Sequence, residues 1–348
     1  MRILIVESEM PYGRGVRGRS LFWFLSTYFG RRAVKVCTAA QLLKSGPKTF
    51  DLVFVGLPTP LGREHLKNLR YDRLALFDLS DFDELIWKDS DRELLCSLTD
   101  RCFKTWVDTR WDFPMTMCVA PLRRPARLRL HAMWDSLIHG DQPGGRRERD
   151  IDVAFLGAPT RPAGQADESQ TPYHQRVEWL LEVNREAPQL NLWGGLTDSP
   201  LRAEVEEQFG DLGDLFLPRR VPFGKYFAAL TRSKVLLTPH GFAPWTYRHY
   251  EAIYAGAAIV TTDFRHIRTL APLPVENMIH VADHEPVVPA IEQAIQLHEE
   301  RPESARENRR MVEDYLSHGG YSKRRPRLLE RFLSQLEPSF STQLLEAA

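Results

Sequence analysis

One stretch of this chain, residues 233–263, reads as a strand, a helix and a second strand. Its two short apolar runs, 234–238 and 258–262, have the pattern of buried strands. Thr246 is a good N-cap for the intervening helix, because its hydroxyl can accept a bond from a free backbone N–H, and Gly256 suits a left-handed C-terminal turn. A strand–helix–strand unit predicts two parallel neighbouring strands in an α/β fold.

The loop of this unit is a candidate ligand site. In open parallel sheets ligands sit beyond the carboxyl ends of the strands, and residues 239–245 occupy that edge. The helix that follows offers free N–H donors and partial positive charge, which suit a phosphate. Arg248 adds a full charge with a forked donor geometry, and Glu251 suits the hydroxyls of a ribose or sugar. The alternative is a plain structural unit in which Arg248 and Glu251 are solvated surface charges.

This run resembles the donor-binding segment of GT-B glycosyltransferases, and the nearest patterns are the exostosin-like and the "glycosyl transferases group 1"-like families. Their segment reads Ser-Lys, four apolar residues, Pro-x-Gly, a short loop, Arg-x-Tyr/Phe-Glu-Ala, then Gly and a strand. The matching residues are Ser233, Lys234, Pro239, Gly241, Arg248, Tyr250, Glu251, Ala252 and Gly256. Retaining enzymes of the commonest GT-B type carry a second Glu eight positions before the one that matches Glu251. Ala243 stands there, so their donor contact and stereochemistry are not carried over.

The resemblance implies an α/β, GT-B fold. Two Rossmann-like domains would face each other across a cleft, and a C-terminal helix would cross back to the first domain. Residues 140–150, GDQPGGRRERD, combine Gly, Pro and charge as linkers do, and a strand restarts at 151. We therefore expect an acceptor-side domain over 1–140, a donor-side domain over 151–325 and a returning helix over 326–348.

The donor side is expected to hold a nucleotide sugar. By resemblance, Arg220 and Val221 would lie near the nucleotide base, where backbone groups can read a base edge. Arg161 and Arg219 are candidates for the diphosphate, and each is equally a candidate for plain surface charge. The complete expected donor-binding set is Arg161, Arg219, Arg220, Val221, Gly241, Thr246, Tyr247, Arg248 and Glu251.

The catalytic groups have weaker signals. His240 directly precedes Gly241 and could donate to the leaving phosphate, although a histidine in a loop is as often simply hydrogen-bonded or solvated. An inverting enzyme needs a base in its first domain, for which Glu7, Glu9 and Asp81 are candidates. Asp81 precedes an apolar segment, and an aspartate in that position more often caps a helix than acts as a base.

A glycine- and arginine-rich loop follows the first expected strand, 1–6. It contains Gly13, Arg14, Gly15 and Arg17, the candidate acceptor-side residues. The loop satisfies the bare G-x-G-x-x-G pattern, but it lies far from the strand end, so the dinucleotide interpretation is weak. In GT-B proteins this loop faces the cleft and often helps to hold the acceptor. A solvated loop without a ligand is the alternative.

Composition limits the classes of partner and cofactor that the chain is expected to bind. The 46 basic and 46 acidic residues cancel, which argues against nucleic acid as the main partner. Four cysteines without a CxxC pair favour a reducing cytosol, and no apolar run approaches the ~20 residues of a membrane span. No HExxH or paired Cys occurs, so we predict no metal and no cofactor beyond the co-substrate, a UDP-sugar. The oligomeric state has no signal in the sequence.

The predicted function is metal-independent transfer of a sugar from a nucleotide-diphosphate sugar to an acceptor that the sequence does not identify. Two alternatives stay open. A nucleotide-sugar 2-epimerase would share the fold and form products from the donor alone. A non-catalytic module would bind the sugar nucleotide without turnover.

Overall fold

A computed structural model of the chain divides it into two compact units. Unit 1 comprises Met1–Arg124, His266–Leu273 and Glu313–Ala348, and unit 2 comprises Pro125–Arg265 and Pro274–Val312. The residues that the structure describes are 1–7, 17–44, 48–58, 61, 65, 67, 69–79, 85, 89–110, 112–122, 126–139, 149–159, 173–241, 243–315 and 325–336.

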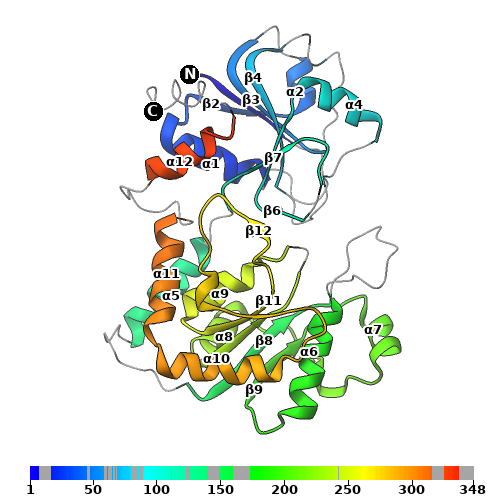
Figure 1. Ribbon diagram of the computed structural model, residues 1–348, viewed down its shortest axis with the longest axis vertical. Helices are drawn as coiled ribbons and strands as arrows, with labels where there is room; N and C mark the ends of the chain where they lie inside the picture. The colour runs from blue at the N-terminus through cyan, green and yellow to red at the C-terminus, as the bar shows by residue number, and fades with distance from the viewer. Residues whose placement is uncertain are drawn as a thin grey trace. The chain divides into compact units, whose positions relative to one another are not determined.

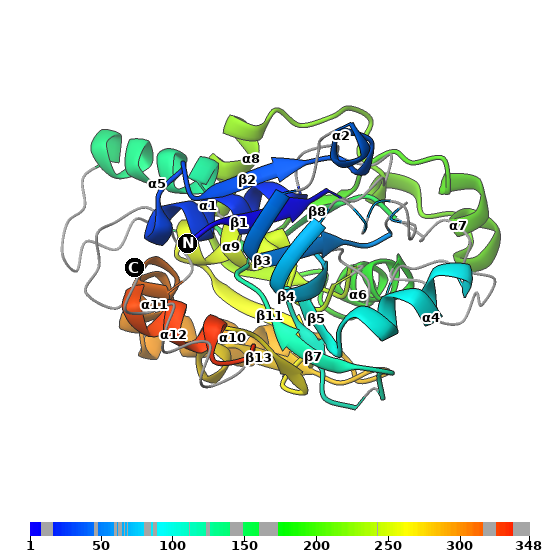
Figure 2. The ribbon, with the colours of Figure 1, turned by 90° about the horizontal axis from the view of Figure 1, so that it is seen from above.

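Unit 1 is built on a parallel sheet of six strands in the order β2-β1-β3-β4-β5-β7 (Figures 1 and 2). Its central strands are apolar along their length because both faces of a parallel sheet are covered. The strands are β1 (Ile3–Val6), β2 (Val34–Cys37), β3 (Lys48–Gly56), β4 (Leu69–Asp78), β5 (Arg101–Lys104) and β7 (Thr116–Val119).

The C-terminal helix belongs to unit 1. Phe332, on α12 (Arg325–Leu333), is fully buried, and its ring packs 5.2 Å from that of Phe24 and 4.7 Å from that of Phe103. Burying an aromatic side chain of this size is among the larger single contributions to a core. The other elements of this unit are α1 (Arg17–Phe29), α2 (Ala39–Leu43), α4 (Asp89–Leu98) and an antiparallel pair, β6 (Val107–Asp108) with β12 (Ile267–Arg268).

Unit 2 is built on a parallel sheet of five strands in the order β13-β11-β10-β8-β9. The reversal of strand order at β8 and β10 is the switch point at which α/β sheets bind ligands. The strands are β8 (Ile151–Gly157), β9 (Leu192–Leu196), β10 (Ser233–Thr238), β11 (Ala258–Thr262) and β13 (Ile279–Val281).

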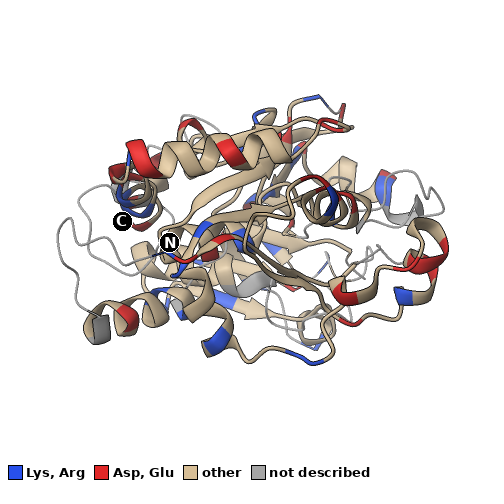
Figure 3. Ribbon diagram, turned by 90° about the horizontal axis from the view of Figure 1, so that it is seen from below, with Lys and Arg blue, Asp and Glu red and all other residues tan. Residues whose placement is uncertain are grey.

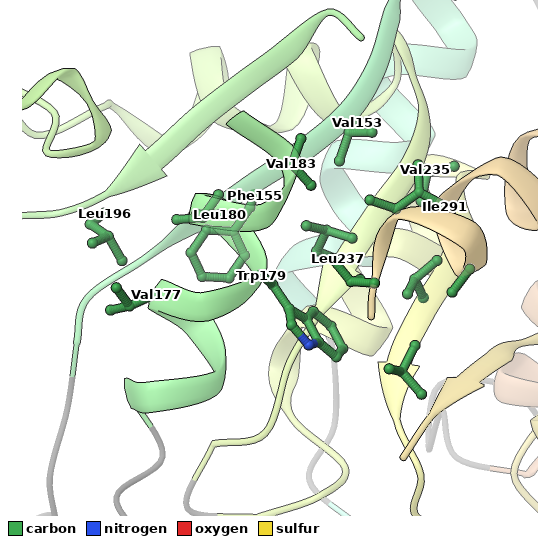
Figure 4. Packing of buried hydrophobic residues seen from close by; sticks show 14 of the residues in the cluster. Val153, Phe155, Val177, Trp179, Leu180, Val183, Leu196, Val235, Leu237 and Ile291 are labelled. Atoms are coloured by element: carbon green, nitrogen blue, oxygen red, sulfur yellow. The ribbon is translucent and has the colours of Figure 1, made fainter. Parts of the chain in front are cut away.

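Helices cover this second sheet and close its core. Figure 4 shows Trp179, Leu180 and Val183 of one helix pointing toward Phe155, Leu237 and their neighbours on the strands. The helices of this unit are α5 (Ala126–His139), α6 (Tyr173–Glu186), α7 (Arg202–Phe209), α8 (Phe223–Leu230), α9 (Tyr247–Ala255), α10 (Val288–Glu300) and α11 (Glu303–Tyr315), whose last three residues are assigned to unit 1. Short 3-10 turns lie at Gly213–Leu215 and Val275–Asn277. None of the helices described combines the length and apolar character needed to cross a bilayer.

One boundary differs from the sequence-based expectation. The structure ends the first part of unit 1 at Arg124 rather than at 140, because α5 packs against α8 and α9 of unit 2. The linker-like composition at 140–150 therefore follows a helix of the second unit.

Candidate functional site

The central strand–helix–strand unit folds as the sequence predicts. β10 and β11 pair in parallel, with Thr238 opposite Thr261, and α9 lies between them in the chain. Thr246 has the extended conformation of an N-cap, with φ −99° and ψ 170°. Gly256 ends the helix with φ 71°, a left-handed conformation that costs glycine little. The N-terminus of α9 therefore lies just beyond the end of β10.

A buried histidine fixes this helix start. His249 Nδ1 accepts a hydrogen bond from the Thr246 backbone N–H at 3.0 Å, so the ring proton sits on Nε2, which lies 2.9 Å from Thr261 Oγ1. Burial lowers the pKa of His249 to about 3, so the ring is neutral. His249 thus ties the first turn of α9 to the end of β11 without adding charge.

Arg248 turns from the first part of α9 toward the end of β8. Its Nε and Nη2 donate to the Leu156 carbonyl at 3.2 and 3.1 Å, and its guanidinium lies 5.1 Å from the centre of the Phe155 ring. A Cβ on Gly157 would overlap Nη2 and lie 2.9 Å from Cζ. Glycine at 157 therefore makes the room in which the Arg248 guanidinium lies.

Arg176 brings a second guanidinium to the same edge of the sheet. From the first turn of α6 it donates to the Ala158 carbonyl at 2.5 Å and to the His240 carbonyl at 3.2 Å. Burial, and then the nearby charge of Arg248, lower the pKa of Arg176 to about 9. Sequence reasoning missed this residue. The sequence indicated only that Arg176 lies in the first turn of the helix after the loop that follows β8.

Glu251 lies buried on the next turn of α9. Its Oε2 accepts a 2.5 Å hydrogen bond from the Tyr226 hydroxyl of α8, and Tyr226 in turn stacks on Trp193 at 6.1 Å. Burial raises the pKa of Glu251, while the Tyr226 hydrogen bond and the Arg248 charge act in the opposite direction. None of the described residues donates a hydrogen bond to the second oxygen, Oε1. Within the described part of the chain, the carboxylate is thus anchored at one oxygen.

The loop after β10 is held by its backbone. The His240 N–H donates to Gln175 Oε1 at 2.8 Å, while its carbonyl accepts from Arg176. A Cβ on Gly241 would lie 3.0 Å from Thr246 Cγ2 and 3.1 Å from Arg176 Nη2, so the chain passes close to both groups here. The His240 side chain is half-buried.

The other sequence-predicted residues are more scattered. Arg219 and Arg220 are exposed and Val221 is half-buried, all just before α8, and Tyr247 is exposed in the first turn of α9. In unit 1, half-buried Glu7 follows β1, and Arg17 begins α1. Six predicted residues lie outside the described part of the chain: Glu9, Gly13, Arg14, Gly15, Asp81 and Arg161.

The chemistry of this edge favours an anion. Two guanidiniums and the N-terminus of α9 converge at the carboxyl ends of β8 and β10, where each supplies positive charge or N–H donors. Glu251, one turn into the helix, offers an acceptor for hydroxyl groups. Across the described ranges, no group of three or more His, Cys, Asp or Glu side chains could hold a metal ion.

Comparison with known proteins gives the fold a name. No protein-family model and no curated sequence matches the chain. Among solved structures, Thermosynechococcus elongatus sucrose-phosphate synthase matches with a TM-score of 0.52 and 13% identity, covering 100% of both chains. A Rickettsia africae glycosyltransferase gives 0.51 and 11%, covering 97% of this chain and 98% of its own. Anabaena HepE, solved in complex with UDP, gives 0.50 and 11% over 99% of both chains. The chain has the GT-B fold, with two Rossmann-like units.

Proposed function

We propose that the protein is a glycosyltransferase that moves a sugar from a UDP-sugar to an acceptor. The observation that carries the proposal is the convergence of Arg176 and Arg248 on the ends of β8 and β10, beside the N-terminus of α9. The fold shared with HepE, whose structure contains UDP, supports uridine as the nucleoside.

The two arginines suit a diphosphate. Arg176 donates hydrogen bonds to two neutral carbonyls. The nearby charge of Arg248 contributes to the lowered pKa of Arg176, because the two like charges repel. A bound diphosphate would offset that repulsion and accept from both guanidiniums. The same groups would stabilise the negative charge that develops on the departing UDP in the transition state.

Glu251 would hold the hydroxyls of the ribose. Its Oε1 accepts no hydrogen bond from the described residues, while Tyr226 fixes the other oxygen. Hydrogen bonds from hydroxyl groups to a buried carboxylate are charge-assisted and geometrically selective. This arrangement accounts for an acid placed next to an anion site.

The remaining roles are part of the same proposal. Positive charge from arginines and the α9 N-terminus would serve in place of a metal ion, with His240 donating to the leaving phosphate. The base would be one of Glu7, Glu9 and Asp81. Arg161 and Arg219 would add to the diphosphate site, Arg220 and Val221 to the base site, and Gly13, Arg14, Gly15 and Arg17 to the acceptor site.

Calorimetric titration with UDP and a UDP-sugar panel tests the proposal. We expect Arg248→Ala and Arg176→Ala each to weaken binding more than tenfold, because a hydrogen bond to a charged group contributes about 1.5–3 kcal/mol. Arg202→Ala, at an exposed position on α7 where Arg202 pairs with Glu206, is the matched control and should leave affinity unchanged. Sugar transfer from the preferred donor should persist in EDTA. Equal affinity in the wild type and both site variants would contradict the proposal.

A further inference from the structure

Helix α5 carries an apolar stripe on its exposed side. Eight large apolar side chains are exposed among the described residues, and half of them lie on this one helix. They are Leu130 (55% exposed), Met133 (46%), Trp134 (59%) and Leu137 (69%). Spacings of three, four and seven residues put them on one face, whereas Leu128 and Ala132 lie buried on the opposite face. α5 therefore has a second apolar face directed to solvent, here called the α5 stripe.

Both edges of the α5 stripe carry positive charge. At about 100° per residue, Arg127 lies ~60° to one side of Leu130 and Arg129 ~100° to the other. Both arginines are exposed. Asp135, the one acidic residue of the helix, lies ~140° from Leu130, near the buried face. In Figure 3 most of the α5 ribbon is tan, the colour of residues other than Lys, Arg, Asp and Glu.

The stripe is presented on a fixed support. His131 of α5 packs its ring 4.7 Å from Phe223 and 5.9 Å from Phe227 on α8, which lies beside α5 in Figure 2. The Arg127 guanidinium lies 4.1 Å from the Phe223 ring centre, so this cation is held in place as well. Docking through a preordered face costs little conformational entropy.

We propose that the α5 stripe docks onto the surface of an anionic lipid bilayer, whatever reaction the chain performs. An apolar face with a tryptophan and with arginines along its edges matches the boundary between acyl chains and negative headgroups. At 14 residues the helix is about 21 Å long, too short to cross a bilayer, so it would lie in the plane of the interface. A second copy of the chain fits less well, because it would gather the arginines of both copies around one contact.

Flotation of the full-length protein with lipid vesicles tests the inference. Vesicles of phosphatidylcholine alone are compared with vesicles in which about a third of the lipid is phosphatidylglycerol. We expect binding to the anionic vesicles only. Leu137→Glu should weaken it more than tenfold, and Arg129→Gln about fivefold, since one cation near the surface contributes about 1 kcal/mol. Leu43→Glu, at a 43% exposed leucine on α2, is the matched control and should bind as the wild type does.

Three results would overturn the inference. One is the absence of flotation with anionic vesicles. Another is equal flotation of the wild type and Leu137→Glu, with thermal unfolding showing both to be folded. The third is a concentration-dependent dimer that Leu137→Glu dissociates while vesicles leave the wild type unbound, which would mean that a second copy covers the stripe.

Discussion

At the residue scale, the candidate site is defined by charges that the fold holds at a cost. Glu251 is buried with a raised pKa, and Arg176 is buried with a lowered one. Each shift means that the folded protein disfavours the charged form of that group. Sites that bind charged or polar ligands often carry groups whose pKa is shifted in this way.

The pH dependence of stability should reveal the charge on Glu251. A carboxyl with a raised folded-state pKa keeps its proton longer in the folded than in the unfolded protein, so stability falls as pH rises from about 4.3 through that raised pKa. Glu251→Gln removes this loss and keeps an acceptor for Tyr226. We expect the variant to be more stable than the wild type at pH 7, with the difference shrinking as the pH falls toward the ordinary pKa of a glutamic acid.

Urea unfolding between pH 4 and pH 7.5 measures this difference. Glu178→Gln, at an exposed position on α6, is the control and should track the wild type throughout. The same Glu251→Gln protein should bind UDP-sugars more than tenfold more weakly. A variant less stable than the wild type at pH 7 would show that the carboxylate stabilises the empty protein.

At the scale of single elements, the sequence predicts best where local chemistry and tertiary packing agree. β10, α9 and β11 were predicted from apolar runs, the Thr246 cap and Gly256, and all three are confirmed. The sequence analysis did not identify α5, because the α5 stripe adds exposed apolar residues to the buried Leu128 and Ala132 and removes a clear periodicity.

β5 was missed because its sequence is more polar than that of an ordinary buried strand. Its four residues begin with Arg101 and end with Lys104, which is not the pattern of a buried strand. The structure buries Lys104 completely, because its Nζ lies 3.3 Å from a carboxylate oxygen of Asp78 at the end of β4. A buried ion pair between neighbouring strands is a tertiary fact that no local pattern shows.

The end of β8 offers an element-scale test of the site. Gly157→Ala places a methyl group where the Arg248 guanidinium lies, and a flexible side chain can move aside. We expect the free energy of unfolding to fall by only about 1 kcal/mol, the contribution of the lost hydrogen bonds to Leu156. UDP affinity should fall about tenfold, because the cation is displaced.

Chemical denaturation and UDP titration of the same preparation measure both effects. Gly224→Ala in α8, where an added Cβ meets nothing within 4 Å, is the control. It should stabilise slightly, since alanine favours a helix over glycine, and bind UDP as the wild type does. Unchanged UDP affinity in Gly157→Ala would argue against a ligand role for Arg248.

At the scale of the whole molecule, the fold could be predicted and the site only in part. A second strand-and-loop start at 151 indicated two Rossmann-like domains, and the GT-B fold bears this out. Arg248 and Glu251 could be singled out because they lie in the first turns of the helix that follows one strand. Arg176 could not, because it reaches the site from α6, and only the pairing of β8 with β10 brings the two segments together.

The α5 stripe and the candidate site belong to the same unit. α5 packs against α9, whose N-terminus forms part of the anion site. A protein docked through the stripe would therefore hold the unit that carries its proposed UDP-sugar site at the lipid surface.

The decisive measurement is a crystal structure of the protein soaked with UDP. We expect the diphosphate at the carboxyl ends of β8 and β10, with its oxygens within about 3.2 Å of guanidinium nitrogens of Arg248 and Arg176. We also expect a ribose hydroxyl to donate to Glu251. A diphosphate bound elsewhere, with Arg248 still donating to the Leu156 carbonyl and Arg176 to the Ala158 and His240 carbonyls, would contradict this arrangement.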